Sequence, residues 1–381
     1  MSQSTSNRAR LRLGIAALFI LATGCTNSSS PSRSAETLPA TTSGPMTDDP
    51  ISPPVLKQRE IVLLAYDSFV LSKGVLEVFT ATTGIPVKVI TQGDAGELVN
   101  SAILTKDSPE SGVLWGVDST LLSRAIDAKL FEPYVSTLAA DIDPTLRALA
   151  PGNEVTPVDR GDVCVNYDKA ALAAKGVEAP TRLEDLVDSK YKGMLVVQSP
   201  STSSPGLAFL LATIARFGED SKTGWQSYWT ALKANDVKVV SGWTEAYETW
   251  FSGGTGKGDR PLVVSYGTSP AAAVLFGADP KAATSPTAVI DDTCYRQIEF
   301  AGVLRGEAQT EAKALLDFLV SPVVQEDMQL NQFVFPVNTK AKIAEPLTRF
   351  AAKPVTSAEI APAEVAKNRE RWIDEWTKVV G

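Results

Sequence analysis

Short apolar runs alternate with segments of helical spacing through the first half of the chain. The runs at 61–65, 87–90 and 113–117 predict strands that are buried on both faces of a parallel sheet. Helices are expected between them, one ending near residue 82 and one beginning after residue 96. This alternation predicts a doubly wound α/β fold, in which ligands bind beyond the carboxyl ends of the strands.

The second half repeats the pattern, with further strands expected at 155–167, 194–197, 237–240, 262–265 and 294–303. Helices are expected at 183–187, 207–217 and 225–232. These elements predict a second domain with its own sheet. Val365, Trp372 and Trp376 share one face of a C-terminal helix, which should therefore dock onto a core.

Polar and aromatic residues stand where the predicted strands of the first half end. Tyr66 follows an apolar strand, and this position favours a binding site over packing. Asp94 fits a site and a helix cap about equally well. Asp118 also follows a strand, but the helical sequence after it favours a simple cap.

The stretch 198–206 leads from a predicted strand into the amphipathic helix at 207–217. Thr202, Ser203 and Ser204 place hydroxyl groups at the N-terminus of this helix, and Pro205 suits its first turn. Hydroxyl groups and free N–H groups at a helix N-terminus can bind an anion. An ordinary Ser/Pro cap without a ligand explains the same residues.

Two strand ends in the second half carry aromatic residues. Trp243 and Glu245 follow the strand at 237–240, and Tyr266 follows the strand at 262–265. Trp243 either packs in a domain core or faces a ligand. Its place after a glycine at a strand end favours the ligand site.

Composition excludes several classes of function. The net charge is −8 and the chain has no long basic run, which argues against nucleic acid as a partner. The sequence contains no histidine, so Ser-His-Asp catalysis, Cys-His catalysis and His-ligated metals are excluded.

The N-terminus predicts a lipoprotein. Basic residues precede an apolar run at 13–22, which is short for a membrane span and leads to Cys25. Residues 1–25 are therefore predicted to be a signal peptide that ends in an acylated Cys25, although a buried cysteine at the end of an apolar helix would look similar. Residues 26–59 are rich in Ser, Thr and Pro and predict a disordered tether.

Several segments, in one order, resemble the thiamine-binding subunits of bacterial ABC importers. They are LAYDSF at 64–69, STSSPG at 201–206, GWTEAY at 242–247, VSYGTSP at 264–270, FPV at 335–337 and the helix at 362–376. The likeness covers nearly the whole chain from about residue 61. It implies a two-lobed periplasmic-binding-protein fold of the type II flytrap class, each lobe a sheet flanked by helices. The first lobe would hold 60–163 and 292–381, and the second 164–291.

The resemblance also implies which residues bind the ligand. Tyr66, Trp243 and Tyr266 would be aromatic contacts and Asp94 a polar one, with Glu245 as a further carboxylate. The hydroxyls of 202–204 would receive the hydroxyethyl or phosphate end of the ligand. The chain departs from the family pattern at Ala272, where a stacking aromatic is usual, and at Phe333, where tryptophan is usual.

The sequence thus predicts a binding protein that captures thiamine or its phosphates and delivers them to a membrane permease. Other cationic solutes, namely polyamines or ferric iron, are alternatives. A thiamine-degrading transferase with Cys164 as nucleophile is a rival from another class. Cys164 has an obvious partner in Cys294, because these are the only cysteines left once Cys25 is acylated. We therefore expect a disulfide, no catalysis, no cofactor and no metal site, in a monomer anchored outside the cell membrane.

Overall fold

The computed structural model describes residues 60–108, 112–220, 222–306, 308–354 and 356–381. The predicted signal peptide, Cys25 and the tether at 26–59 lie outside the described residues. No described helix combines the length and the apolar character needed to cross a membrane.

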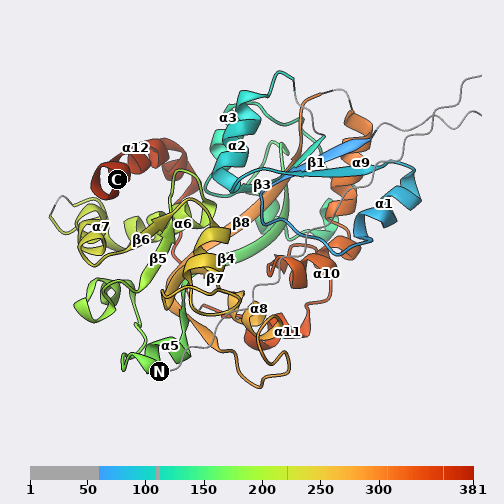
Figure 1. Ribbon diagram of the computed structural model, residues 1–381. Helices are drawn as coiled ribbons and strands as arrows, with labels where there is room; N and C mark the ends of the chain where they lie inside the picture. The colour runs from blue at the N-terminus through green and yellow to red at the C-terminus, as the bar shows by residue number, and fades with distance from the viewer. Residues whose placement is uncertain (1–59, 109–111, 221, 307, 355) are drawn as a thin grey trace, which may run out of the picture. The chain divides into compact units, whose positions relative to one another are not determined.

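The strands of the described chain join into one sheet (Figure 1). They are β1 (Ile61–Ala65), β2 (Val87–Thr91), β3 (Val113–Asp118), β4 (Thr156–Asp168), β5 (Leu195–Gln198), β6 (Lys238–Val240), β7 (Leu262–Tyr266), β8 (Thr287–Val303) and β9 (Phe335–Pro336). Their order is β2-β1-β3-β8-β4-β7-β5-β6, and β9 pairs with β4. The α/β fold class is confirmed.

Two long antiparallel strands hold the sheet together. β4 and β8 pair with each other through most of their length, and β8 also pairs with β3 while β4 also pairs with β7. At each end of the sheet the strands are parallel, β1 with β2 and β3, and β5 with β6 and β7. The expectation that the second domain has a separate sheet is therefore wrong, because β4 and β8 are long enough to join both groups.

The predicted lobe boundaries, at 163/164 and 291/292, fall inside β4 and β8. The division into lobes stays a prediction. β8 begins at Thr287, seven residues before the predicted strand at 294–303. Its register with β4 shifts between Val163 and Val165, opposite the polar pair Asp291 and Asp292. This irregularity interrupts the apolar pattern that would have revealed the whole strand.

Helices flank the sheet. They are α1 (Val75–Thr83), α2 (Ala95–Leu104), α3 (Leu122–Asp127), α4 (Pro144–Arg147), α5 (Lys169–Ala174), α6 (Ser204–Phe217), α7 (Trp225–Ala234), the π-helix η4 (Glu245–Trp250), α8 (Ser269–Leu275), α9 (Gln309–Leu319), α10 (Pro322–Asn331), α11 (Glu345–Phe350) and α12 (Pro362–Val380). Short 3₁₀ turns lie at Ala139–Asp141, Leu183–Val187 and Ser189–Tyr191.

Helix α6 is central to the packing, because it contacts β4, β5, β7 and β8. Its apolar residues recur at helical spacing, and Leu207, Leu210 and Leu211 are fully buried. Pro205 lies in the first turn and Ser203 occupies the N-cap, as predicted. The Ser203 side chain nevertheless makes no capping hydrogen bond.

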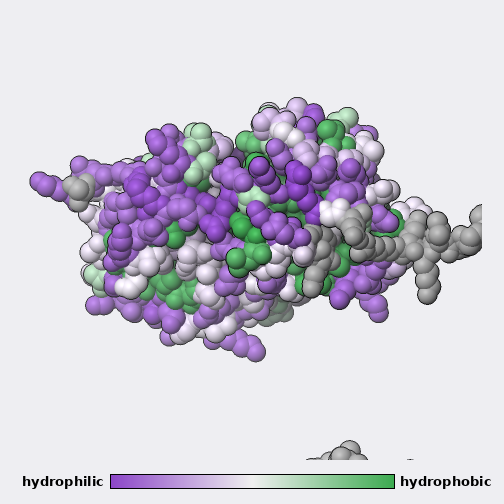
Figure 2. Space-filling model, turned by 90° about the horizontal axis from the view of Figure 1, so that it is seen from above, coloured by the Kyte–Doolittle hydropathy of each residue, from purple (hydrophilic) through white to green (hydrophobic). Residues whose placement is uncertain are grey.

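The C-terminal helix docks onto the core, as its apolar face predicts. Trp372 and Trp376 are buried, and the Trp376 ring packs edge-on against Trp229 of α7 at 5.5 Å between centroids. Figure 1 shows α12 beside α7. Seen from above, polar residues cover most of the surface, and hydrophobic residues appear between them in small separate patches (Figure 2).

Candidate ligand-binding site

A cavity of about 360 Å³ lies where strand ends and helix N-termini meet. Tyr66 follows β1, Asp159 comes from β4 and Glu299 from β8. The first residues of α2, α6 and α8 also line the cavity. This is the location that the rule for open α/β sheets predicts.

The cavity brings together six of the residues predicted from the sequence. They are Tyr66, Asp94, Ser204, Trp243, Tyr266 and Phe333. The other three, Thr202, Ser203 and Glu245, are not among the lining residues. Ligand contact by any of the nine stays a prediction.

Two of the three outlying residues, Thr202 and Glu245, form hydrogen bonds with the protein itself, and the third is buried. The Thr202 hydroxyl donates to the Ser241 carbonyl oxygen at 2.6 Å. Ser203 is buried at the start of α6. Glu245 accepts hydrogen bonds from Trp250 Nε1 at 3.2 Å and from the Ser241 hydroxyl at 3.3 Å.

Ser204 lines the cavity, but its hydroxyl donates to the buried Asp118 carboxylate. Asp118 also accepts from the Thr120 N–H at 2.6 Å, just before α3. Asp118 is fully buried and does not line the cavity. Asp118 is thus a structural residue, but not the helix cap that the sequence favoured, because α3 begins at Leu122 with Leu121 at its N-cap.

Asp94 joins two segments that are far apart in the sequence. Its Oδ1 accepts from the Ala95 N–H at 2.6 Å, at the start of α2. Its Oδ2 accepts from the Trp243 N–H at 2.8 Å. Burial raises the pKa of Asp94 to about 6, although these two N–H groups favour the ionised form. As pH falls through this value the carboxylate is neutralised, and both charge-assisted bonds weaken.

One wall of the cavity is aromatic. The Trp243 ring stacks on Tyr247 of η4 with 4.9 Å between centroids and 13° between planes. Trp243 Nε1 donates to Ser265 Oγ at 2.9 Å, so the ring is held in place. One face of the indole is covered by Tyr247. A flat cation could therefore stack only on the opposite face.

A second aromatic group lines the cavity near the alanine at position 272. Phe276 comes one helical turn after Ala272, and both line the cavity. Phe276 is 60% exposed and its ring meets Phe333 edge-on at 5.5 Å. Phe333 adopts a φ of 54°, which is unusual for a bulky residue, and its carbonyl oxygen accepts from the Thr268 hydroxyl.

Asp159 and Glu299 form a buried pair of carboxyl groups at the cavity wall. They are direct register partners on β4 and β8. Glu299 Oε2 accepts from Trp115 Nε1 at 2.9 Å and lies 3.1 Å from the Tyr66 hydroxyl. Burial and the neighbouring Glu299 carboxylate raise the pKa of Asp159 well above its usual range, and burial raises the pKa of Glu299.

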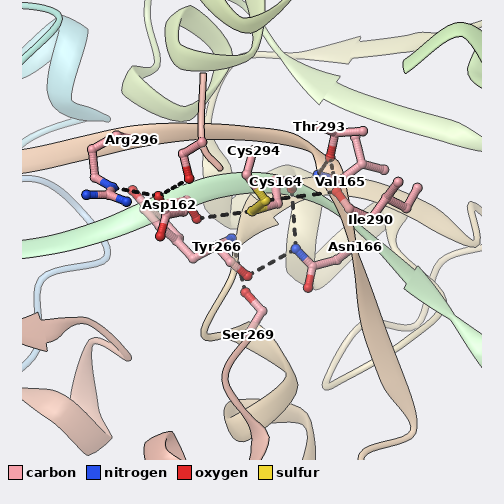
Figure 3. Close-up of a disulfide and its surroundings, with 11 residues drawn as sticks. Asp162, Cys164, Val165, Asn166, Tyr266, Ser269, Ile290, Thr293, Cys294 and Arg296 are labelled. Carbon is pink, nitrogen blue, oxygen red and sulfur yellow. Dashed lines mark hydrogen bonds and ion pairs between the residues drawn. A yellow bond between two sulfur atoms is a disulfide. The ribbon is translucent and has the colours of Figure 1, made fainter. Parts of the chain in front are cut away.

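The predicted disulfide between Cys164 and Cys294 is present and joins β4 to β8 (Figure 3). Both cysteines are fully buried. Tyr266 lies next to them, and its carbonyl oxygen accepts from Asn166 Nδ2 at 3.1 Å. The disulfide thus lies beside β7, where Cys164 pairs with Ser265, the neighbour of the lining Tyr266.

The charged side chains that line the cavity are all acidic. Five carboxyl groups line it, from Asp67, Asp94, Asp159, Glu248 and Glu299. Among the described lining residues there is no lysine or arginine. Aromatic faces and carboxylates together suit a flat cation, because a cation gains from both the ring quadrupole and the negative charge.

Sequence reasoning missed several lining residues. Asp159 and Glu299 lie in strands that carry other charged residues, Arg160 and Asp162 in β4 and Asp291, Asp292 and Arg296 in β8, so the sequence does not single them out. Tyr247 and Phe276 fall in helical segments, where aromatic residues are usually core, so their sequence gives no signal either.

Comparisons with known proteins agree with this geometry. The family model for bacterial extracellular solute-binding proteins matches residues 113–361. The thiamine-binding periplasmic protein of Escherichia coli K12 is 32% identical over 338 residues, which cover 86% of this chain and 95% of that protein. Its namesake from Salmonella typhimurium is 30% identical, with the same coverage. A solved structure of a periplasmic thiamin-binding protein superposes with a TM-score of 0.72 at 29% identity, covering 84% of this chain and 96% of the other.

Proposed function

Since the chain belongs to the bacterial extracellular solute-binding proteins, we propose that it captures thiamine in the cavity and delivers it to the membrane permease of an ABC importer. The observation that carries this proposal is the combination of aromatic walls and carboxyl groups in one cavity. Thiamine carries a permanently cationic thiazolium ring and a flat aminopyrimidine. Both fit such a lining.

Capture would use closure of the two predicted lobes. Contacts between them already lie beside the cavity: Asp94 accepts from the Trp243 N–H, and the Glu97 N–H donates to the Thr202 carbonyl oxygen at 3.3 Å. Opening would break these bonds, and a ligand that contacts both sides would favour the closed state. The permease would then recognise the closed state.

Titration with thiamine tests the proposal directly. We expect saturable heat in calorimetry and quenching of tryptophan fluorescence, since Trp243 lines the cavity. Thiamine diphosphate should bind more weakly than thiamine, because its phosphates would face five carboxyl groups without a lysine or arginine among the described lining residues. Spermidine serves as a control cation without a ring. No heat and no quenching at millimolar thiamine would contradict the proposed substrate.

The other candidate functions have less support. The relatives that are 29–32% identical over 86% of the chain are named as thiamine-binding proteins, whereas an iron uptake protein of Synechocystis with the same coverage of this chain is 24% identical, which disfavours ferric iron. A transferase that uses Cys164 needs a free thiolate, whereas this cysteine is buried in a disulfide. The relatives are binding proteins, and the proposal includes no catalysis.

The family's members act outside the cytoplasmic membrane, and we propose that a lipid on Cys25 anchors this monomeric chain there. Replacing Cys25 with alanine should move the protein from the membrane fraction to the soluble fraction, because the acyl chains supply the anchor. Cell fractionation with immunoblotting measures the change. An unmodified N-terminus in the mass spectrum of the wild-type protein would show that the anchor is absent.

A further inference from the structure

We propose that Asp159 and Glu299 share one proton in the free protein and release it when the cationic ligand binds. This inference rests on the proposed function, because it concerns the same cavity. It makes the acid pair the group that recognises positive charge on the ligand. It also makes ligand capture dependent on pH.

The geometry places both carboxyl groups on one side of the sheet. Asp159 and Glu299 pair directly across β4 and β8, and both line the cavity. Side chains of direct cross-strand partners lie roughly 5 Å apart at Cβ. Asp159 is 3% exposed and Glu299 is 5% exposed, so water screens their repulsion poorly. Two buried carboxylates at this separation do not both ionise readily.

Asp159 interacts with the Glu299 carboxyl group across the strand pair. Its Oδ2 is buried and accepts no hydrogen bond from any N–H or hydroxyl group of the described residues. Glu299, by contrast, is held by Trp115 and lies beside the Tyr66 hydroxyl. A buried carboxyl pair at a cavity wall, with no N–H or hydroxyl donor at Asp159 Oδ2, can accept positive charge from a ligand.

The surroundings favour the protonated pair until a cation arrives. The other titratable groups near it are Asp118, the last residue of β3, Tyr66 after β1 and Tyr266 at the end of β7. The Asp118 carboxylate repels a second negative charge on the pair, and the tyrosines are neutral. A bound cation reverses this balance: the shared proton passes to the buffer, and the pair carries two negative charges beside the ligand.

Calorimetry in buffers of different ionisation enthalpy counts the protons released. At about pH 7.5, we expect wild-type protein to release protons on binding, up to one per thiamine, and affinity to rise with pH, by at most tenfold per pH unit for one proton. Asp94 contributes little there, because its pKa is about 6. Asp159→Asn keeps the shape of the side chain but cannot ionise. It should abolish the proton release.

Asp291→Asn is the matched control, since it removes one negative charge from an exposed position on β8 that does not line the cavity. It should keep the proton release of the wild type. Thiamine binding without proton release would overturn the acid-pair inference and leave the proposed function intact. Absence of thiamine binding would instead overturn the proposed function. The wild-type measurement shows whether thiamine binding releases a proton, even if Asp159→Asn does not fold.

Discussion

Removing the disulfide by the double substitution Cys164→Ala and Cys294→Ala should lower the free energy of unfolding by about 2–5 kcal/mol. The bridge closes a loop of 130 residues between β4 and β8. In the chain-entropy view, a loop this long confers stability mainly by restricting the unfolded chain. The strands that it joins are those that connect the two parallel ends of the sheet.

Urea denaturation of the double variant, with oxidised and reduced wild type beside it, measures this loss. Reduced wild type should resemble the variant, because the effect comes from the covalent link and not from the sulfur atoms. Titration of thiols in unreduced, denatured wild type should find neither Cys164 nor Cys294 free. A variant as stable as the oxidised protein would show that the hydrogen bonds between β4 and β8 suffice without the bridge.

Replacing Trp243 with alanine should weaken thiamine binding by about 1–3 kcal/mol, or roughly 5- to 150-fold, the range for losing an aromatic anchor that stacks on a cation. The indole is fixed for this role by Tyr247 on one face and by the hydrogen bond to Ser265. It is only half-buried. The loss of stability should therefore fall below the ~3–5 kcal/mol typical of a fully buried tryptophan.

Trp250→Ala is the matched control for this variant. Trp250 belongs to the same π-helix region and is also half-buried, but it does not line the cavity. It should cost stability without a comparable loss of affinity. Calorimetry with thiamine and thermal denaturation of both variants separate the two effects. Equal affinity losses in the two variants would mean that Trp243 acts through packing alone.

The sequence by itself determined the fold class and much of the cavity. A parallel strand that is covered on both faces has a continuous apolar sequence. Residues 61–65 and 113–117 could therefore be predicted as strands. Because open α/β sheets bind ligands at their carboxyl ends, Tyr66, Asp94 and Trp243 could be selected by their place after strands. The disulfide followed from the small number of cysteines.

Only the tertiary structure decided which polar groups remain free to face a ligand. The hydroxyls of Thr202 and Ser204 looked like an anion site, yet they donate to Ser241 and Asp118, which lie far away in sequence. Phe276 reached the cavity through the helical turn that begins at Ala272. Hydrogen-bond partners from distant segments leave no local pattern, so the chain could not reveal them.

The continuous sheet and the pairing of Asp159 with Glu299 both result from the pairing of β4 with β8. β8 runs through a register shift that hides its first residues from an apolar pattern, and its length joins both ends of the sheet. That register sets Asp159 opposite Glu299. Sequence supplies two acidic residues among several charged ones in the same strands. Their interaction exists only because the strands pair, since a shift of one residue would move either side chain to the opposite face.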